Sequence, residues 1–143
     1  MQSDGTPWRP LVHVEDISRA FLAVLQAPRD LVHDQAFNVG ASSENYRIRD
    51  VAALVEEGVT GTRVTLAPEA GPDARSYQVD CSKLARVLPA AVPHWDVRRG
   101  VAELYEAYKR HGMTHEDFVG SRYLRVKRVR ELQESGRLDN ELR

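Results

Sequence analysis

Apolar and polar residues alternate along the chain in short strand-like and helix-like patterns. The first apolar stretch, Trp8–Val14, leads directly into residues 17–26, where apolar positions recur at intervals of three and four and predict a helix. Asp16 stands where a helix N-cap is expected, and Ala27-Pro28 ends the pattern. Pro10 lies inside the first stretch and predicts a sheet edge or a bulge, because proline cannot donate to a ladder.

The alternation continues through the next eighty or so residues. Short β-branched or apolar runs predict strands, and amphipathic runs closed by glycine or proline predict helices. The predicted strands are Ala36–Gly40, Arg63–Leu66 and Tyr77–Asp80, and the predicted helices are Arg49–Glu57, Ser82–Leu88 and Val97–His111, with Val101, Leu104, Tyr105 and Tyr108 facing inward. A Pro/Gly loop is expected over residues 67–74. This order predicts a mixed α/β fold of short elements, without a run of long βαβ units.

The sequence changes character after residue 112. Residues 113–120 indicate a polar connection, and Val126–Ser135 predicts a helix with Val126 and Val129 on its apolar side. Residues 1–108 hold 11 basic and 15 acidic side chains, whereas residues 109–143 hold 9 and 6. We therefore expect a substrate-binding body over residues 1–112 and a basic helical tail over residues 113–143.

Composition excludes several classes of function. The formal net charge of −1 gives no overall reason to expect a nucleic-acid partner, and no apolar run approaches the roughly 20 residues of a membrane helix. Cys81 is the only cysteine, which excludes an internal disulfide and favours a cytoplasmic setting. The histidines form no ligand pair with metal-binding spacing, so no metal is expected.

Two arginines are the strongest candidates for binding chemistry. Arg9 lies within the first predicted strand, and Arg75 lies just before the predicted strand Tyr77–Asp80. A guanidinium can hold phosphate oxygens through two parallel hydrogen bonds, and two guanidinium groups from different segments can clamp a diphosphate. Spacing alone equally allows a pair of surface arginines in local ion pairs.

Three segments together resemble the extended short-chain dehydrogenase/reductase family, the NAD-dependent sugar-nucleotide epimerases and dehydratases. Arg9–Asp16 is similar to the family's Arg-aromatic-apolar-(His/Tyr)-Val-x-Asp stretch, and Phe37–Gly40 to its (Tyr/Phe)-Asn-(Leu/Val/Ile)-Gly stretch. Arg75–Leu84 resembles Arg-x-Tyr-x-x-Asp-x-(Ser/Gly)-Lys-(Ile/Leu). The three segments occur in the family's order, and the resemblance covers roughly residues 3–110.

The resemblance implies that the chain is the C-terminal mixed α/β substrate-binding portion of such an enzyme, with the Rossmann half absent. The family's substrate is a nucleotide-sugar, whose diphosphate would be bound by Arg9 and Arg75, with His13 and Asn38 as possible site-lining residues. NAD(P) would be bound by the missing half. We expect no catalytic, cofactor-binding or metal-binding residue in this chain, and we expect the isolated chain to be inactive, marginally stable and prone to aggregate.

A Tyr-x-x-x-Lys pattern, Tyr105 to Lys109, matches the catalytic dyad of short-chain dehydrogenases. We interpret it as coincidental, because no glycine-rich strand-turn-helix precedes it. Oligomerisation through the family's usual interface is not expected, since helices of the missing half form that interface. Two alternatives stay open: a non-catalytic module that binds a nucleotide-sugar, another anion or a protein, and a nucleic-acid-binding accessory protein that acts through residues 122–130.

Overall fold

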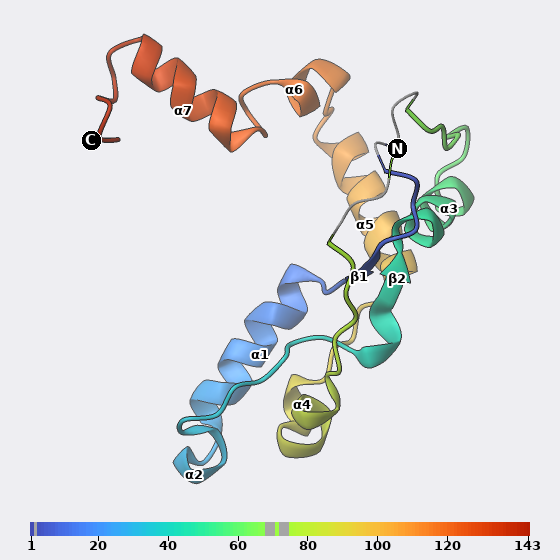
Figure 1. The fold of residues 1–143 in the computed structure, drawn as a ribbon, viewed down its shortest axis with the longest axis vertical. Helices are drawn as coiled ribbons and strands as arrows, with labels where there is room; N and C mark the ends of the chain where they lie inside the picture. The colour runs from blue at the N-terminus through green and yellow to red at the C-terminus, as the bar shows by residue number, and fades with distance from the viewer. Residues whose placement is uncertain (2, 68–70, 72–74) are drawn as a thin grey trace. The chain divides into compact units, whose positions relative to one another are not determined.

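The computed structural model describes residues 1, 3–67, 71 and 75–143, so most of the expected 67–74 loop lies outside the described residues. Its elements in chain order are β1 (Trp8–Pro10), α1 (Val14–Gln26), α2 (Arg29–Val32), the 3-10 helix η1 (Ser42–Glu44), β2 (Asn45–Arg47), α3 (Ile48–Gly58), α4 (Ser82–Val87), the 3-10 helix η2 (Pro89–Ala91), α5 (Val97–Arg110), α6 (His115–Val119) and α7 (Arg125–Glu134) (Figure 1). The predicted mixed α/β composition is confirmed.

The chain divides into two compact units, Met1–Leu104 and Tyr105–Arg143. The division falls inside α5. The functional division predicted after residue 112, between a substrate-binding body and a basic tail, stays a prediction. The first unit holds both strands and the buried core, and the second consists of the end of α5 with α6 and α7.

β1 and β2 pair antiparallel, with Arg9 opposite Tyr46. Pro10 occupies the last position of this pairing, as expected for a residue that cannot donate to a ladder. A hydrogen bond from Leu11 N to Glu44 O at 2.9 Å continues the contact beyond the strand end. A two-stranded sheet is marginal by itself, so the helices packed around it must supply most of the stability.

The strand predictions for residues 36–40, 63–66 and 77–80 are wrong: none of the three lies in a ladder within the part of the chain that the structure describes. A strand needs a hydrogen-bonded neighbour, and a local apolar run carries no information about whether one is present. Residues 45–47, for which no strand was predicted, form β2.

Side-chain amides replace a ladder along residues 77–80. Asn45 accepts from Val79 N through Oδ1 at 2.9 Å and donates to Val79 O through Nδ2 at 3.0 Å, as a neighbouring peptide group would. Asn38 Nδ2 donates to Asp80 O at 2.9 Å. These bonds satisfy backbone groups that a sheet would otherwise pair.

Asn45→Ala is therefore expected to destabilise the first unit by about 1–2 kcal/mol, because it removes both bonds to Val79. Urea denaturation measures the loss, and the amide of Val79 should exchange faster with deuterium. Asn140→Ala, at an exposed position, is the matched control. Equal stability of the two variants would show that the two hydrogen bonds between Asn45 and Val79 do not stabilise the first unit.

Two predictions about helix ends are corrected. Asp16 is not the N-cap of α1: the helix begins at Val14, and the His13 ring caps it by accepting from Glu15 N at 3.2 Å through Nδ1. The connection expected over residues 113–120 contains α6, begun by a capping box in which Thr114 Oγ1 accepts from Asp117 N at 3.1 Å. Thr114-x-x-Asp117 was the sequence signal for that helix.

The core of the first unit lies where α1 meets α4 and η2. Its buried members are Ala20, Leu84, Leu88 and Ala91, and partly buried residues including Phe37 and Val24 pack around them. Some residues that were predicted on the inward, apolar faces of the later helices are exposed to solvent. Leu104 is 49% exposed and Val126 is 66% exposed.

Candidate functional site

Arg9 and Arg75, 66 residues apart in sequence, meet at the edge of β1. The Arg9 guanidinium donates through Nη1 to the main-chain oxygen of Trp8 at 2.7 Å and to the main-chain oxygen of Arg75. Its central carbon lies 5.4 Å from the centre of the Tyr77 ring. Residues 76 and 77 are fastened to the same strand, since Ser76 Oγ accepts from Trp8 N at 3.1 Å.

This arrangement fixes the position of a permanent positive charge. Two carbonyls and an aromatic ring hold the half-buried Arg9 guanidinium, and Arg75 is exposed beside it. A guanidinium has five N–H donors, and a pre-oriented one loses less entropy when it binds a phosphate or carboxylate. The site is suited to an anion at the surface of the sheet.

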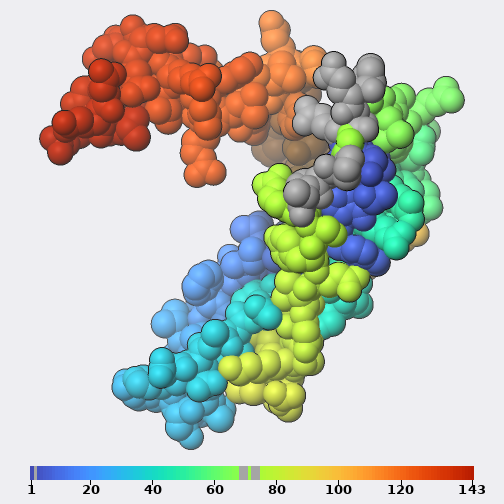
Figure 2. Space-filling view, in the orientation of Figure 1, coloured from blue at the N-terminus to red at the C-terminus, as the bar shows by residue number. Residues whose placement is uncertain are grey.

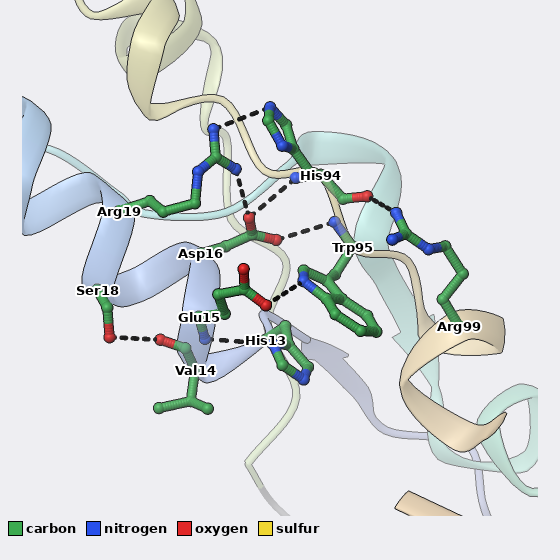
Figure 3. Close-up of polar contacts among 9 residues, drawn as sticks. All are labelled: His13, Val14, Glu15, Asp16, Ser18, Arg19, His94, Trp95 and Arg99. Atoms are coloured by element: carbon green, nitrogen blue, oxygen red, sulfur yellow. Dashed lines mark hydrogen bonds and ion pairs between the residues drawn. The ribbon is translucent and has the colours of Figure 1, made fainter. Parts of the chain in front are cut away.

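His13 is held in a stack rather than poised as a base. Its ring lies on Trp95, with centroids 4.1 Å apart and planes 13° apart, and the guanidinium of Arg99 is 4.6 Å from the Trp95 ring centre (Figure 3). Because Nδ1 accepts from Glu15 N, the ring proton belongs on Nε2, which lies 3.1 Å from Glu103 Oε2. Both nitrogens are thus engaged.

His13 also lines a largely apolar cleft of about 270 Å³ within the first unit. The apolar walls come from the residues just after β1 and from α3 and α5, and they include Leu11, Val55, Val97 and Val101. The substrate-site-lining role of His13 stays a prediction, and both ring nitrogens already have partners.

Asp16, which sequence analysis treated only as a cap, is the buried polar centre of this region. Its carboxylate is 0% exposed and accepts from His94 N at 3.0 Å, Trp95 N at 2.9 Å and Arg19 Nη1 at 2.9 Å (Figure 3). Burial by itself raises the pKa of Asp16, but the hydrogen bonds from the two backbone amides and Arg19 outweigh it, so the pKa lies below its usual range. The signal in the sequence was an acid on the apolar face of a helix.

Asn38 and Cys81 line a second cavity of about 220 Å³ beside residues 10–12. Asn38 is exposed and its amide nitrogen donates to Asp80 O, so this side chain satisfies a backbone group beside the cavity. Its role in lining a substrate site stays a prediction. Cys81 is 5% exposed, and burial raises the pKa of its thiol. A buried, protonated thiol behaves as a small apolar residue rather than a nucleophile.

Tyr105 and Lys109 form a local pair on the end of α5. Lys109 Nζ lies 4.9 Å from the Tyr105 ring centre and donates to Glu106 Oε1 at 3.0 Å. The hydrogen bond and charge of Glu106 raise the pKa of Lys109. Lys109 thus stays charged and half-exposed in an ordinary ion pair within one helix. The Tyr-x-x-x-Lys match is still interpreted as coincidental.

The basic tail is partly engaged in contacts of its own unit. Lys127 Nζ donates to Val119 O at 2.7 Å, and Arg128 pairs with Glu131 at 3.4 Å. Within the described residues, no cluster of three or more His, Cys, Asp or Glu side chains could hold a metal ion. Nor does any helix there combine the length and apolar character required to cross a bilayer.

Comparison with known proteins finds a family match over the first part of the chain. Residues 1–40 match the model of the NAD dependent epimerase/dehydratase family. The family resemblance inferred from Arg9–Asp16 and Phe37–Gly40 is thereby confirmed for this part of the chain.

One solved structure has a similar fold. The fold is similar to the UDP-glucuronic acid 4-epimerase of Bacillus cereus, crystallised in complex with UDP-glucuronic acid and NAD, with a TM-score of 0.64 and 21% sequence identity. The match covers 78% of this chain and 35% of that epimerase, so the chain spans about a third of its length. No curated protein matches the sequence.

Proposed function

We propose that this chain is the nucleotide-sugar-binding portion of an NAD-dependent sugar-nucleotide epimerase or dehydratase, with Arg9 and Arg75 binding the diphosphate. The main observation that supports this proposal is a contact: Arg9, inside the segment that matches the family, donates a hydrogen bond to the backbone of Arg75. The relative of similar fold was crystallised with UDP-glucuronic acid, a diphosphate of the proposed class.

The residues of this chain do not fit an NAD site. The sequence contains no Gly-x-x-Gly-x-x-Gly segment between a strand and a helix, the feature that brings a backbone close to a pyrophosphate. We therefore assign no cofactor contact and no chemical step to these residues. In the proposed enzyme, the cofactor-binding half supplies both, and these residues hold the substrate; alone, the chain is inactive.

The test is binding of UDP-glucuronic acid to the 143-residue chain, measured by isothermal titration calorimetry. Arg9→Ala combined with Arg75→Ala is expected to weaken binding by about 100-fold or more, since each of the two lost charge-assisted hydrogen bonds contributes roughly 1.5–3 kcal/mol. Arg130→Ala in α7 is the control for a single loss of positive charge, and it should leave affinity unchanged.

Binding of three further ligands shows which part of UDP-glucuronic acid the chain recognises. UDP should retain most of the affinity, whereas glucuronic acid alone and NAD should bind weakly, because the diphosphate is what the arginines recognise. Undiminished binding by the double variant, or no binding by the wild-type chain, would refute the assignment. Equal affinity for inorganic pyrophosphate would instead favour a general anion-binding module.

A further inference from the structure

We infer that α7 is the contact surface of a homodimer, in which two copies of this chain pack their α7 helices side by side in opposite directions. The inference goes beyond nucleotide-sugar binding and does not depend on it. Three observations carry it: the division of charge along the helix, the mismatch between those charges and the helix dipole, and the exposed apolar residues beside them.

The charges of α7 and its flanking residues are divided along the chain. Residues 122–130 hold five cationic side chains and no acidic one, whereas residues 131–141 hold four acidic side chains and one cationic. The charged residues of the helix itself, in order, are Arg125, Lys127, Arg128, Arg130, Glu131 and Glu134. Its first turn contains no acid, and its last turn contains no base.

This pattern is the reverse of the one that stabilises a single helix. The N-terminus of a helix carries partial positive charge, so acids are favourable there and cations are favourable at the other end. The N-cap residue of α7, Leu124, also provides no side-chain hydrogen bond to the first turn. A helix of 10 residues is marginal by itself. Contacts with another surface of opposite charge are therefore needed to stabilise it.

The second unit leaves much of this helix uncovered. Neither α6 nor the end of α5 packs extensively along it. The residues after α7 fold back only on its last turn, since Leu138 N donates to Leu132 O at 3.1 Å. Figure 2 shows α7 and these residues (orange-red to red) as one continuous surface. Val126, in the first turn, stays 66% exposed, and Tyr123, just before the helix, is 51% exposed.

Helical spacing places an apolar strip beside a charged flank. Val126 and Val129 share one face, and Lys127, Arg130 and Glu134 follow one another along its edge at intervals of three and four. In an antiparallel pair related by a two-fold axis, the same flank of both helices meets in reverse order. Glu134 of one copy then lies against Lys127 and Arg130 of the other, and symmetry repeats the contact.

A second copy fits this helix better than a polyanion does. Nucleic acid or an anionic membrane surface would attract residues 122–130, but Glu131 and Glu134 on the same helix would repel it. A parallel copy would place like charges together. An antiparallel copy supplies opposite charge to both halves. Because one helix face is smaller than a standard interface, we expect a weak and reversible dimer.

The test is sedimentation equilibrium of the 143-residue chain over a range of concentrations. We expect a monomer–dimer equilibrium with a Kd of about 10–100 μM, weakening as salt is raised because exposed ion pairs are screened. Glu134→Lys should weaken the dimer by about 10-fold or more, since it turns attraction into repulsion in both symmetric contacts. Glu116→Lys, the same change at an exposed position of α6, is the matched control and should leave the dimer unchanged.

Mixing two variants tests whether the charges meet between copies. Glu131→Lys with Glu134→Lys makes α7 basic throughout, and Lys127→Glu with Arg130→Glu makes it predominantly acidic. Each variant alone should be monomeric, and an equimolar mixture should form a dimer. Circular dichroism checks that each variant is folded. Restoration by mixing cannot come from a purely structural effect within one copy, so a mixture that stays monomeric would contradict the inference.

Three other outcomes would overturn it. The first is a wild-type chain that stays monomeric at several hundred micromolar, well above the expected Kd of about 10–100 μM. The second is a dimer insensitive to Glu134→Lys, which would place the contact elsewhere. The third is a monomer that binds a polyuridine oligonucleotide or phosphatidylglycerol vesicles through residues 122–130. Failure of the proposed function is separable, because Arg9→Ala with Arg75→Ala should impair UDP-glucuronic acid binding and leave the dimer intact.

Discussion

Asp16→Asn is expected to lower the free energy of unfolding by about 3 kcal/mol, the scale found when one partner of a buried, hydrogen-bonded ion pair is removed. The carboxylate is fully buried and accepts from two backbone amides and from Arg19. An asparagine of the same shape would turn an NH₂ group toward these donors and leave the guanidinium without its counter-charge. Urea denaturation followed by circular dichroism measures the loss.

Acid should have the same effect on the wild-type protein. The folded-state pKa of Asp16 lies below its usual range, because the hydrogen bonds outweigh the burial that would raise it. A carboxyl group of this kind stabilises the fold above its unfolded pKa of about 3.9, and the contribution is lost as pH falls through the lower folded value. The stability difference between wild type and Asp16→Asn should therefore be constant at neutral pH and shrink below about pH 4.

The matched control is Asp30→Asn, the same chemical change at an exposed position of α2. It should shift stability by less than about 0.5 kcal/mol. Parallel behaviour of the two variants, or a stability difference that persists unchanged to pH 3, would show that the Asp16 contacts contribute little.

Leu84→Ala should cost about 3 kcal/mol, and for a different physical reason. Leu84 is 1% exposed and lies at the centre of the cluster formed by α1, α4 and η2. Removing its side-chain atoms leaves a cavity that the short surrounding elements can only partly fill, and Leu→Ala substitutions in cores cost roughly 2–5 kcal/mol. In so small a core, a substantial fraction of the total stability is at stake.

Leu25→Ala makes the identical chemical change at a helical residue that is 80% exposed. We expect it to change the stability of the isolated chain by no more than about 0.5 kcal/mol. Thermal melts of the two variants beside the wild type are sufficient. A similar loss in both would mean that the face assigned as exposed is covered in solution.

Sequence periodicity predicted the helices well because a helix is determined by residues close in the chain. The predicted Arg49–Glu57 differs from α3 by one residue at each end, and the predicted Val97–His111 differs from α5 by one residue at its C-terminal end. Strands depend on neighbours that local sequence does not reveal, and so residues 36–40 and 77–80 were predicted as strands although no ladder forms there. Their composition is that of strands, but within the described residues the side-chain amides of Asn45 and Asn38 bond to Val79 and Asp80, and no strand pairs with residues 36–40.

The candidate site shows the same limit. Arg9 and Arg75 were selected by residue type and family resemblance, and the structure adds the contact between them. The partners of Asp16 could not be predicted, because it bonds to the main-chain amides of His94 and Trp95, 78 and 79 residues away. A backbone amide leaves no mark in the sequence, so only the acid on the apolar helix face was visible.

Because Cys81 is buried, its reactivity can report local opening of the fold. The buried thiol lies against Gly40: a Cβ added at Gly40 would be 3.2 Å from Sγ. Cys81 therefore packs against the end of segment 36–40. As the chain's single cysteine, it can react with an alkylating reagent only when this region opens. Its labelling rate therefore measures how often segment 36–40 separates from the start of α4, without any change to the sequence.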